Sequence, residues 1–251
     1  MRYWGKFIEI DGSYYDSPMG KSRMPNAAEL AQYVARGQMF NLEGNAALYE
    51  ETVQNMLRDI SIDPVGQILL DAIHRTERKV RIIPLTSNEQ AKMNIRPCAN
   101  PVGKVSPKGN ECVIWYEPWS RMLGVMTGFG TSPYQVLVHE LHHALRQVRG
   151  KWANLPPSLF SGFPHPEEMF SVTIENMYLS SIKQPHRMNA NYTEGIPLGN
   201  RTDRDWYKQY GAELETWCND LRDMTVQLER LYGIWNPIRV RRGVLDFAIT
   251  L

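Results

Sequence analysis

The sequence predicts an α+β fold that is mainly helical, with a small mixed sheet beside one histidine-rich helix. Three observations support this class: apolar residues recur at helical spacing over long stretches, short segments read as strands, and clusters of glycine and proline separate them. The chain has 251 residues, of which 43% are hydrophobic. That is enough to build one substantial core, so we expect a single domain over residues 1–251.

The N-terminal part, residues 1–60, reads as a hairpin followed by helices. The elements expected up to residue 117 are a hairpin turning at Asp11-Gly12, helices over residues 26–35, 45–59 and 64–75, and strands over residues 79–85 and 111–117. Residues 86–110 contain three prolines, four asparagines and two glycines, and therefore read as a loop.

The histidine-rich helix lies in the segment SPYQVLVHELHHALRQV. Ser132 is a candidate N-cap, Pro133 suits the first helical position, and Gln135 at the third position completes a capping box. Gly150 is the expected end of the helix. Leu137, Leu141, Ala144, Leu145 and Val148 share one face, which we expect to be buried.

Within this helix, residues 139–143 spell His-Glu-Leu-His-His, an HExxH motif. Residues four apart lie on nearly the same face of a helix, so His139 and His143 can bind one metal ion. Glu140 is turned about 100° away and can reach a water on that ion. The alternative is an amphipathic helix with surface histidines. His142 points to the other side of His139, where it either supports the site from a second layer or faces solvent.

Two further helical patterns follow. Residues 165–182 form the first, with a stripe at helical spacing made of Phe170, Ile174, Met177 and Ser181. Residues 203–232 form a long helix, and its apolar residues at spacings of three and four are expected in the core: Trp206, Tyr210, Leu214, Trp217, Leu221, Met224, Leu228 and Leu231.

A catalytic zinc normally has three protein ligands, so one more is needed. Glu168 and Glu175 are seven residues apart on the helix over residues 165–182 and point the same way. Glu168 is the expected ligand. Glu167 is the second candidate, because Glu167 points about 100° away from the face that Glu168 and Glu175 share. The alternative is that Glu167 and Glu168 only stabilise the helix, because carboxylates in a first helical turn interact favourably with its dipole. His165 is a further, weaker ligand candidate.

The segments HELHHALR and EEMFSVTIENMYLS, about 20 residues apart, resemble the zinc-metallopeptidase effectors of bacterial type III and type VI secretion systems. More distantly they resemble the gluzincins, in which two motif histidines and a later glutamate hold the metal. DPVGQILLDAI followed by KVRIIPL is similar to the helix and strand that open these effector domains. The resemblance covers residues 60–192, the expected catalytic core.

The resemblance implies a zincin-like metalloprotease fold with one zinc ion per chain, held by His139, His143 and Glu168. Thermolysin-like gluzincins have an acidic residue four positions after the ligand glutamate, where this chain has Val172. The group that braces the site would therefore be Glu175 or Ser171. In zincins an edge strand beside the active-site helix pairs with extended substrate; residues 111–117 either take that part or form an internal strand.

The mechanism implied is hydrolysis of a peptide bond by zinc-activated water, with Glu140 as the general base. In zincins, an oxyanion-stabilising donor often follows the third ligand. The run HRMNANY offers Arg187 and Tyr192 for this role, and His186 as an alternative. Each of these residues could equally be an ordinary loop residue.

Charge and cysteine content exclude several other classes. The net charge of +1 from 28 basic and 27 acidic residues gives no reason to expect nucleic acid or an anionic membrane as partner. No apolar run is long enough to span a membrane, and the N-terminus lacks the apolar core of a signal peptide. Cys98, Cys112 and Cys218 have no CxxC spacing, and none lies in a signature of a cysteine nucleophile.

We therefore expect a zinc endopeptidase that acts as a bacterial effector or toxin on a protein of a target cell. It would be synthesised in the bacterial cytoplasm without a signal peptide and delivered by a secretion system. Its expected partners are a protein or peptide substrate, a secretion-system carrier and a cognate immunity protein. The alternative is a non-catalytic binding module on a zincin scaffold, with a structural metal.

Overall fold

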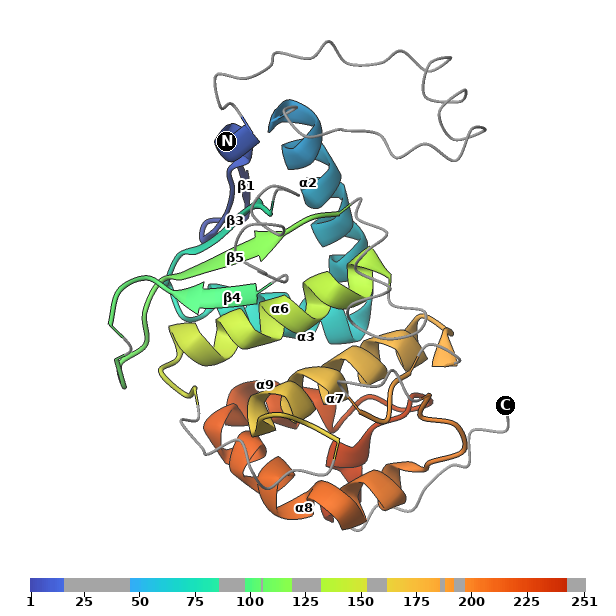
Figure 1. The fold of residues 1–251 in the computed structure, drawn as a ribbon. Coiled ribbons are helices and arrows are strands. Elements are labelled where there is room, and N and C mark those ends of the chain that lie inside the picture. Colours follow the sequence, from blue (N-terminus) through green and yellow to red (C-terminus); the bar gives the residue numbers. More distant parts are fainter. Residues whose placement is uncertain are drawn as a thin grey trace, which may run out of the picture.

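The computed structural model describes residues 1–15, 46–85, 98–104, 106–118, 132–152, 162–185, 188–191 and 197–242 (Figure 1). The described residues form six α-helices and one five-stranded mixed sheet, so the predicted α+β class is confirmed. The sheet and helix α2 (Ala46–Ile62) occupy the upper part of Figure 1. The lower part holds helices α7 (Pro166–Ser181), α8 (Asp203–Asp220) and α9 (Arg222–Leu228). Helix α6 lies between the two parts.

The strand order in the sheet is β1-β2-β3-β5-β4. The strands are β1 (Arg2–Trp4), β2 (Ile8–Ile10), β3 (Val80–Pro84), β4 (Cys98–Pro101) and β5 (Cys112–Tyr116). The central strands β2, β3 and β5 run parallel, whereas β1 and β4 pair antiparallel at the two edges. The predicted strands over residues 79–85 and 111–117 are thus confirmed as β3 and β5, and β5 is internal.

The N-terminal hairpin exists, but its predicted turn at Asp11-Gly12 is wrong. The turn joins Trp4 to Ile8, and Gly5 adopts a φ of +60° there, a conformation that glycine reaches without strain. Asp11 instead follows β2, and its side chain accepts a hydrogen bond from the backbone N–H of Ser13 at 3.0 Å. This local turn begins the 3-10 helix Gly12–Tyr15.

Strand β4 lies within residues 98–101, inside the segment predicted to be a loop, so that prediction is wrong there. The strand has only four residues and ends at Pro101, which gives it a weak local signal. Its stability comes from pairing with β5, with Cys98 opposite Trp115. Long-range pairing of this kind leaves no pattern in the segment itself.

Helices α2 (Ala46–Ile62) and α3 (Pro64–His74) confirm two of the predicted helices. Asp63 separates them, and its carboxylate accepts hydrogen bonds from the N–H groups of Val65 and Gly66 to cap α3. The helix predicted over residues 26–35 lies outside the described residues.

Helix α6 (Pro133–Val148) has the predicted termini. The Ser132 hydroxyl accepts from the backbone N–H of Gln135, and the Gln135 side chain accepts from the backbone N–H of Ser132. The chain leaves the helix at Gly150 with a φ of +63°. Every residue from Gln135 to Val148 is buried, because the sheet covers one side of α6 and α7 (Pro166–Ser181) covers another.

The prediction of one long helix over residues 203–232 is wrong. The segment forms α8 (Asp203–Asp220) and α9 (Arg222–Leu228), because Leu221 between them has non-helical φ and ψ of −119° and 40°. The break lets α9 pack against α3 while α8 packs against the 3-10 helix η4 (Pro237–Arg242). The predicted apolar stripe is confirmed, since all its members are buried except Leu231, which is partly buried.

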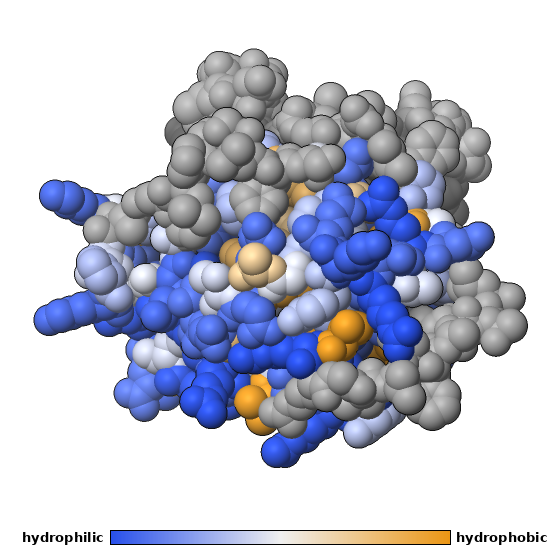
Figure 2. Space-filling model, turned by 90° about the horizontal axis from the view of Figure 1, so that it is seen from below, coloured by the Kyte–Doolittle hydropathy of each residue, from blue (hydrophilic) through white to orange (hydrophobic). Residues whose placement is uncertain are grey.

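The face of the molecule seen from below in Figure 2 is predominantly hydrophilic, with only small apolar spots. Among the described helices, none combines the length and apolar character that a membrane span requires.

Candidate metal centre

The structure brings His139, His143 and Glu168 together between α6 and α7. Nε2 of His139 lies 3.0 Å from Nε2 of His143 and 3.0 Å from Oε2 of Glu168. The third side of this triangle, from Nε2 of His143 to Oε2 of Glu168, is 3.3 Å. Among the described residues, these three form the group of ligand-type side chains that could hold a metal ion.

The donor set of this triangle suits a cation. A carboxylate accepts hydrogen bonds, so Nδ1 of His139, 3.1 Å from Oε2 of Glu175, carries the ring hydrogen. When the ring is neutral, Nε2 of His139 directs its lone pair at the carboxylate oxygen of Glu168. Two electron-rich atoms at this distance repel each other unless a positive charge lies between them.

The spacing of the three atoms fits zinc. Ligand atoms around a tetrahedral zinc ion, bound at 2.0–2.1 Å, lie about 3.3 Å apart. The triangle leaves one tetrahedral position for a water or substrate atom, as catalytic zinc sites do. Glu140 is adjacent in sequence to His139, and its Oε2 is buried and has no hydrogen-bond partner. A buried carboxylate oxygen without a donor is costly, and a water at the fourth position would relieve that cost.

The pKa values in the cluster respond to the same charges. Burial acts to lower the pKa of His139, but its hydrogen bonds with Glu168 and Glu175, together with the charges of Glu168 and Glu140, raise it well above the usual value. Burial acts to raise the pKa of Glu168, yet its interactions with the His143 and His139 rings, by charge and by hydrogen bonding, together lower that pKa far below the usual value. The centre therefore favours a negative charge on Glu168 and a positive charge beside it, whether a proton on His139 or a bound cation.

Burial raises the pKa of Glu140 above its usual value, although His143 and His139 act to lower it. The backbone N–H of Ala99, in the edge strand β4, also hydrogen-bonds to the Glu140 carboxylate. A carboxylate with a raised pKa is a better proton acceptor near neutral pH.

Strand β4 forms the edge of the sheet beside α6, and β5 lies between β3 and β4. Residues 111–117 therefore form an internal strand, the second of the two predicted alternatives, and not an edge strand that pairs with substrate. The Ala99 backbone faces α6: its N–H reaches Glu140, and its carbonyl accepts a hydrogen bond from Nε2 of Gln147 at 2.5 Å. The groups that Ala99 would offer to an added strand are therefore taken by side chains of α6.

Glu175, which the sequence predicts as a bracing group, contacts His139 and two amides. Its Oε1 accepts hydrogen bonds from Nε2 of Gln135 and, at 3.1 Å, from Nδ2 of Asn189. The sequence predicts Gln135 only as a capping residue and predicts no role for Asn189. No local signal could have revealed either contact, because the partners lie 40 and 14 residues from Glu175.

Ser171, the other predicted brace, contacts His143. Its Oγ lies 3.1 Å from Nδ1 of His143 and 2.8 Å from Nδ1 of His142. Trp217 of α8 donates its indole N–H to Nε2 of His142 at 2.9 Å, so His142 is neutral and donates to Ser171. His142 is fully buried, so the predicted alternative in which it faces solvent is wrong. It contacts the centre only through Ser171, which also contacts His143. Burial lowers the pKa of His142 far below the usual value.

Two candidate ligands lie elsewhere. Glu167 is fully buried in an ion pair with Arg146, at 2.8 Å from Nη2, and Arg146 also contacts Asp220 of α8 at 2.8 Å. His165 caps α7, since its Nδ1 accepts from the backbone N–H of Glu167 at 3.2 Å. The His165 ring stacks on Trp152 at 6.1 Å between centroids, and Trp152 in turn contacts the ring of His143 at 5.2 Å.

Arg187, Tyr192 and His186, the candidates for the oxyanion donor, lie outside the described residues. They stay predictions. Residues 188–191, between them, are described, and Asn189 reaches the centre through Glu175.

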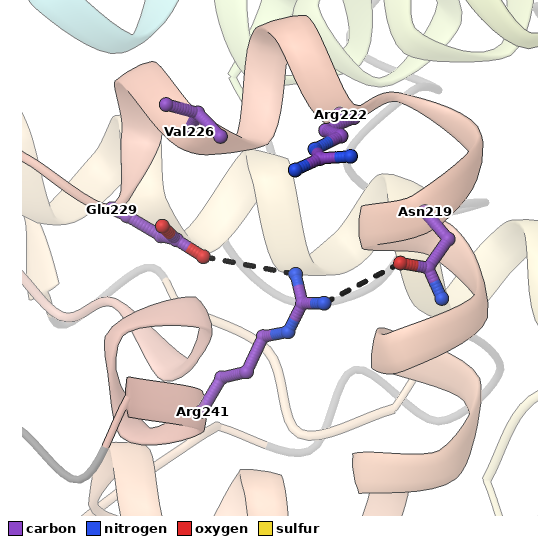
Figure 3. Close-up of a pocket in the computed structure, with 5 residues that line it drawn as sticks. All are labelled: Asn219, Arg222, Val226, Glu229 and Arg241. Carbon is purple, nitrogen blue, oxygen red and sulfur yellow. Dashed lines mark hydrogen bonds and ion pairs between the residues drawn. The ribbon is translucent and has the colours of Figure 1, made fainter.

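A hollow of about 400 Å³ lies in the C-terminal part of the described structure, between α8, α9 and η4 (Figure 3). Arg241 reaches across it toward Asn219 at 3.4 Å and Glu229 at 3.8 Å. Nε of Arg241 also forms an ion pair with Glu215 at 2.8 Å. The charge of Arg241 is therefore matched by carboxylates, and the hollow shares no residue with the metal centre.

Two histidines and a glutamate around one position, with a second glutamate beside them, define a class of site that can bind a metal and move a proton. Residues 36–157 match the family model Peptidase_M91, described as an effector protein. The chain is thus similar over this segment, which includes the HExxH motif, to a peptidase-like effector family. No curated protein matches the chain. Glu168, Ser171 and Glu175 lie beyond the matched segment, so their place at the centre rests on the structure.

Proposed function

We propose that this protein is a zinc-dependent endopeptidase of the zincin type. One observation carries the proposal: three metal-ligand atoms form a triangle with sides of 3.0–3.3 Å, and the buried Glu140 beside it has a carboxylate oxygen without a partner. The similarity of residues 36–157 to a peptidase family supports hydrolysis of peptide bonds as the reaction.

His139, His143 and Glu168 would hold the ion. When bound, zinc supplies Lewis-acid chemistry, in which it lowers the pKa of water and polarises a carbonyl. Glu140 accepts the proton of the attacking water and gives it to the leaving amine, and its raised pKa suits both transfers. Glu175 and Ser171 orient the two imidazole rings through their Nδ1 atoms.

The cysteines are poor candidates for a rival nucleophile. Burial raises the pKa of Cys98 to about 11 and that of Cys218 to about 12, which disfavours the reactive thiolate. Cys112 is buried in β5, and burial raises its pKa further still.

We also propose that the protein is an effector that a secretion system delivers into another cell, where it cleaves a protein. The description of the matched family as an effector protein supports this. A secretion-system carrier and an immunity protein in the producing cell belong to the same proposal.

The test compares wild type with Glu140→Gln, which keeps the shape of the side chain and removes its basicity. Each protein is incubated with a peptide library prepared from a bacterial and a human cell lysate, and new peptide N-termini are identified by mass spectrometry. We expect cleavage by wild type, at least about 100-fold less by Glu140→Gln, and the same zinc content in both. Equal cleavage by both proteins would contradict the proposal. Zinc binding without any cleavage would favour the non-catalytic module instead.

A further inference from the structure

Three buried donors hold the carboxylate of Glu175 between α6 and α7. Its Oε2 accepts from Nδ1 of His139 at 3.1 Å, and its Oε1 accepts from Nδ2 of Asn189, also at 3.1 Å, and from Nε2 of Gln135. Glu175 is only 5% exposed, so these donors replace the water that would otherwise solvate it. The two amides leave the carboxylate one orientation, with Oε2 toward His139.

Gln135 uses both ends of its amide. Its Oε1 accepts from the backbone N–H of Ser132 at 3.4 Å, while its Nε2 donates to Glu175. The capping box at the start of α6 thus fixes which end of the Gln135 amide faces Glu175. The N-terminus of α6 is thereby connected, through Gln135, to Glu175. Glu175 in turn orients His139, which follows Gln135 by four residues on α6.

Asn189 is held by its backbone, not by its side chain. Asn176 of α7 donates from Nδ2 to the Asn189 carbonyl at 2.7 Å and accepts from the Asn189 N–H at 2.8 Å. Both contacts are buried. They anchor the segment 188–191 on α7, so that the Asn189 side chain projects at Glu175.

We propose that Gln135, Asn176 and Asn189 form an amide clamp that sets the affinity of the centre for its metal. They are positioning residues: the clamp holds Glu175 on Nδ1 of His139 and so keeps Nε2 of His139 directed at His143 and Glu168. The inference rests on the proposed zinc site. A fully satisfied buried polar network specifies one arrangement, which is the property a metal site of high affinity requires.

The test measures zinc affinity by competition with a fluorescent chelator, and the absorption spectrum of the cobalt-substituted protein. Asn189→Ala removes the donor to Glu175 and leaves the backbone contacts with Asn176 in place. We expect its zinc affinity to fall about tenfold, the lower end of the range for groups that support a ligating histidine, with a change in the cobalt spectrum. Asn189→Ser, which also removes the amide donor and adds no buried charge, should weaken binding by a similar factor and serves where Asn189→Ala does not fold.

Asn236→Ala is the matched control. Asn236 is also fully buried and donates one side-chain hydrogen bond, to the Leu228 carbonyl at 2.8 Å, but it lies in the C-terminal part away from the centre. It should lower the stability of the metal-free protein and leave zinc affinity and the cobalt spectrum unchanged. Equal zinc affinity of wild type and both Asn189 variants would overturn the clamp alone. Failure of wild type to bind zinc would overturn the clamp and the proposed function together.

Discussion

His139 and Glu175 face each other across helices α6 and α7, with Nδ1 of the imidazole 3.1 Å from Oε2 of the carboxylate. This contact fixes which nitrogen of His139 points at His143 and Glu168. It joins the helix that carries the HExxH motif to the helix that carries Glu168, the proposed third ligand.

We predict that Glu175→Gln lowers zinc affinity by about 10- to 100-fold, because an amide can donate to Nδ1 of His139 and so favour the wrong ring tautomer. Isothermal titration of zinc into the metal-free protein measures the effect. Thr173→Val is the control, since Thr173 lies on the same helix and contacts Trp206, at 3.1 Å, instead of a histidine. If both variants bind zinc as wild type does, Glu175 does not brace the site.

Adjacent glutamates should behave in opposite ways. Glu167→Gln breaks the buried pair with Arg146 and leaves that guanidinium without its full partner, so the free energy of unfolding should fall by about 3–5 kcal/mol. Zinc binding per folded chain should persist. Glu168→Gln should abolish tight zinc binding.

Urea denaturation with and without zinc separates these two phenotypes. Zinc stabilises a folded protein that binds it, so wild type and Glu167→Gln should gain stability from zinc, whereas Glu168→Gln should not. The reverse pattern would identify Glu167 as the ligand.

Asp223 makes stability depend on pH at the contact between α9 and α6. The hydrogen bond from Arg149, together with the charges of Arg149 and Arg75, lowers its pKa below the usual value against the opposing effect of burial. Because the folded pKa lies below the unfolded one, the stabilisation is complete above about pH 4 and is lost as the pH falls through the folded pKa. The pair is partly exposed, so its contribution is at most about 1 kcal/mol.

The measurement compares wild type with Asp223→Asn at pH 7 and pH 3. We expect the difference in free energy of unfolding to be present at pH 7 and to shrink at pH 3. Asp71→Asn, at an exposed position of α3, should show no such difference. A difference for Asp223→Asn that is equal at both pH values would contradict the assignment.

Local signals in the sequence predicted the parts of the fold that local interactions decide. The capping box of Ser132 and Gln135, and the proline at each helix start, predicted α6 and α7 within a residue or two. The helical spacing of residues 206–228 predicted the buried stripe but not the break at Leu221. That break follows from how α8 and α9 pack on different neighbours.

The rest depended on contacts between distant residues. Strand β4 has four residues, and only its pairing with β5 reveals it. The spacing of the motif and the direction of Glu168 predicted which three ligand-type side chains meet between α6 and α7, since these directions follow from helix geometry. The supporting groups did not follow: Trp217 is 75 residues from His142, and only the folded chain shows that they meet.

The zinc content of the purified protein, measured as ions per chain by elemental analysis after dialysis, tests the proposed metal site directly. We expect one zinc per chain in wild type and in Glu140→Gln, and no more than traces in Glu168→Gln and His143→Ala. A wild type without zinc, or a Glu168→Gln protein that retains a full equivalent, would contradict the proposed site.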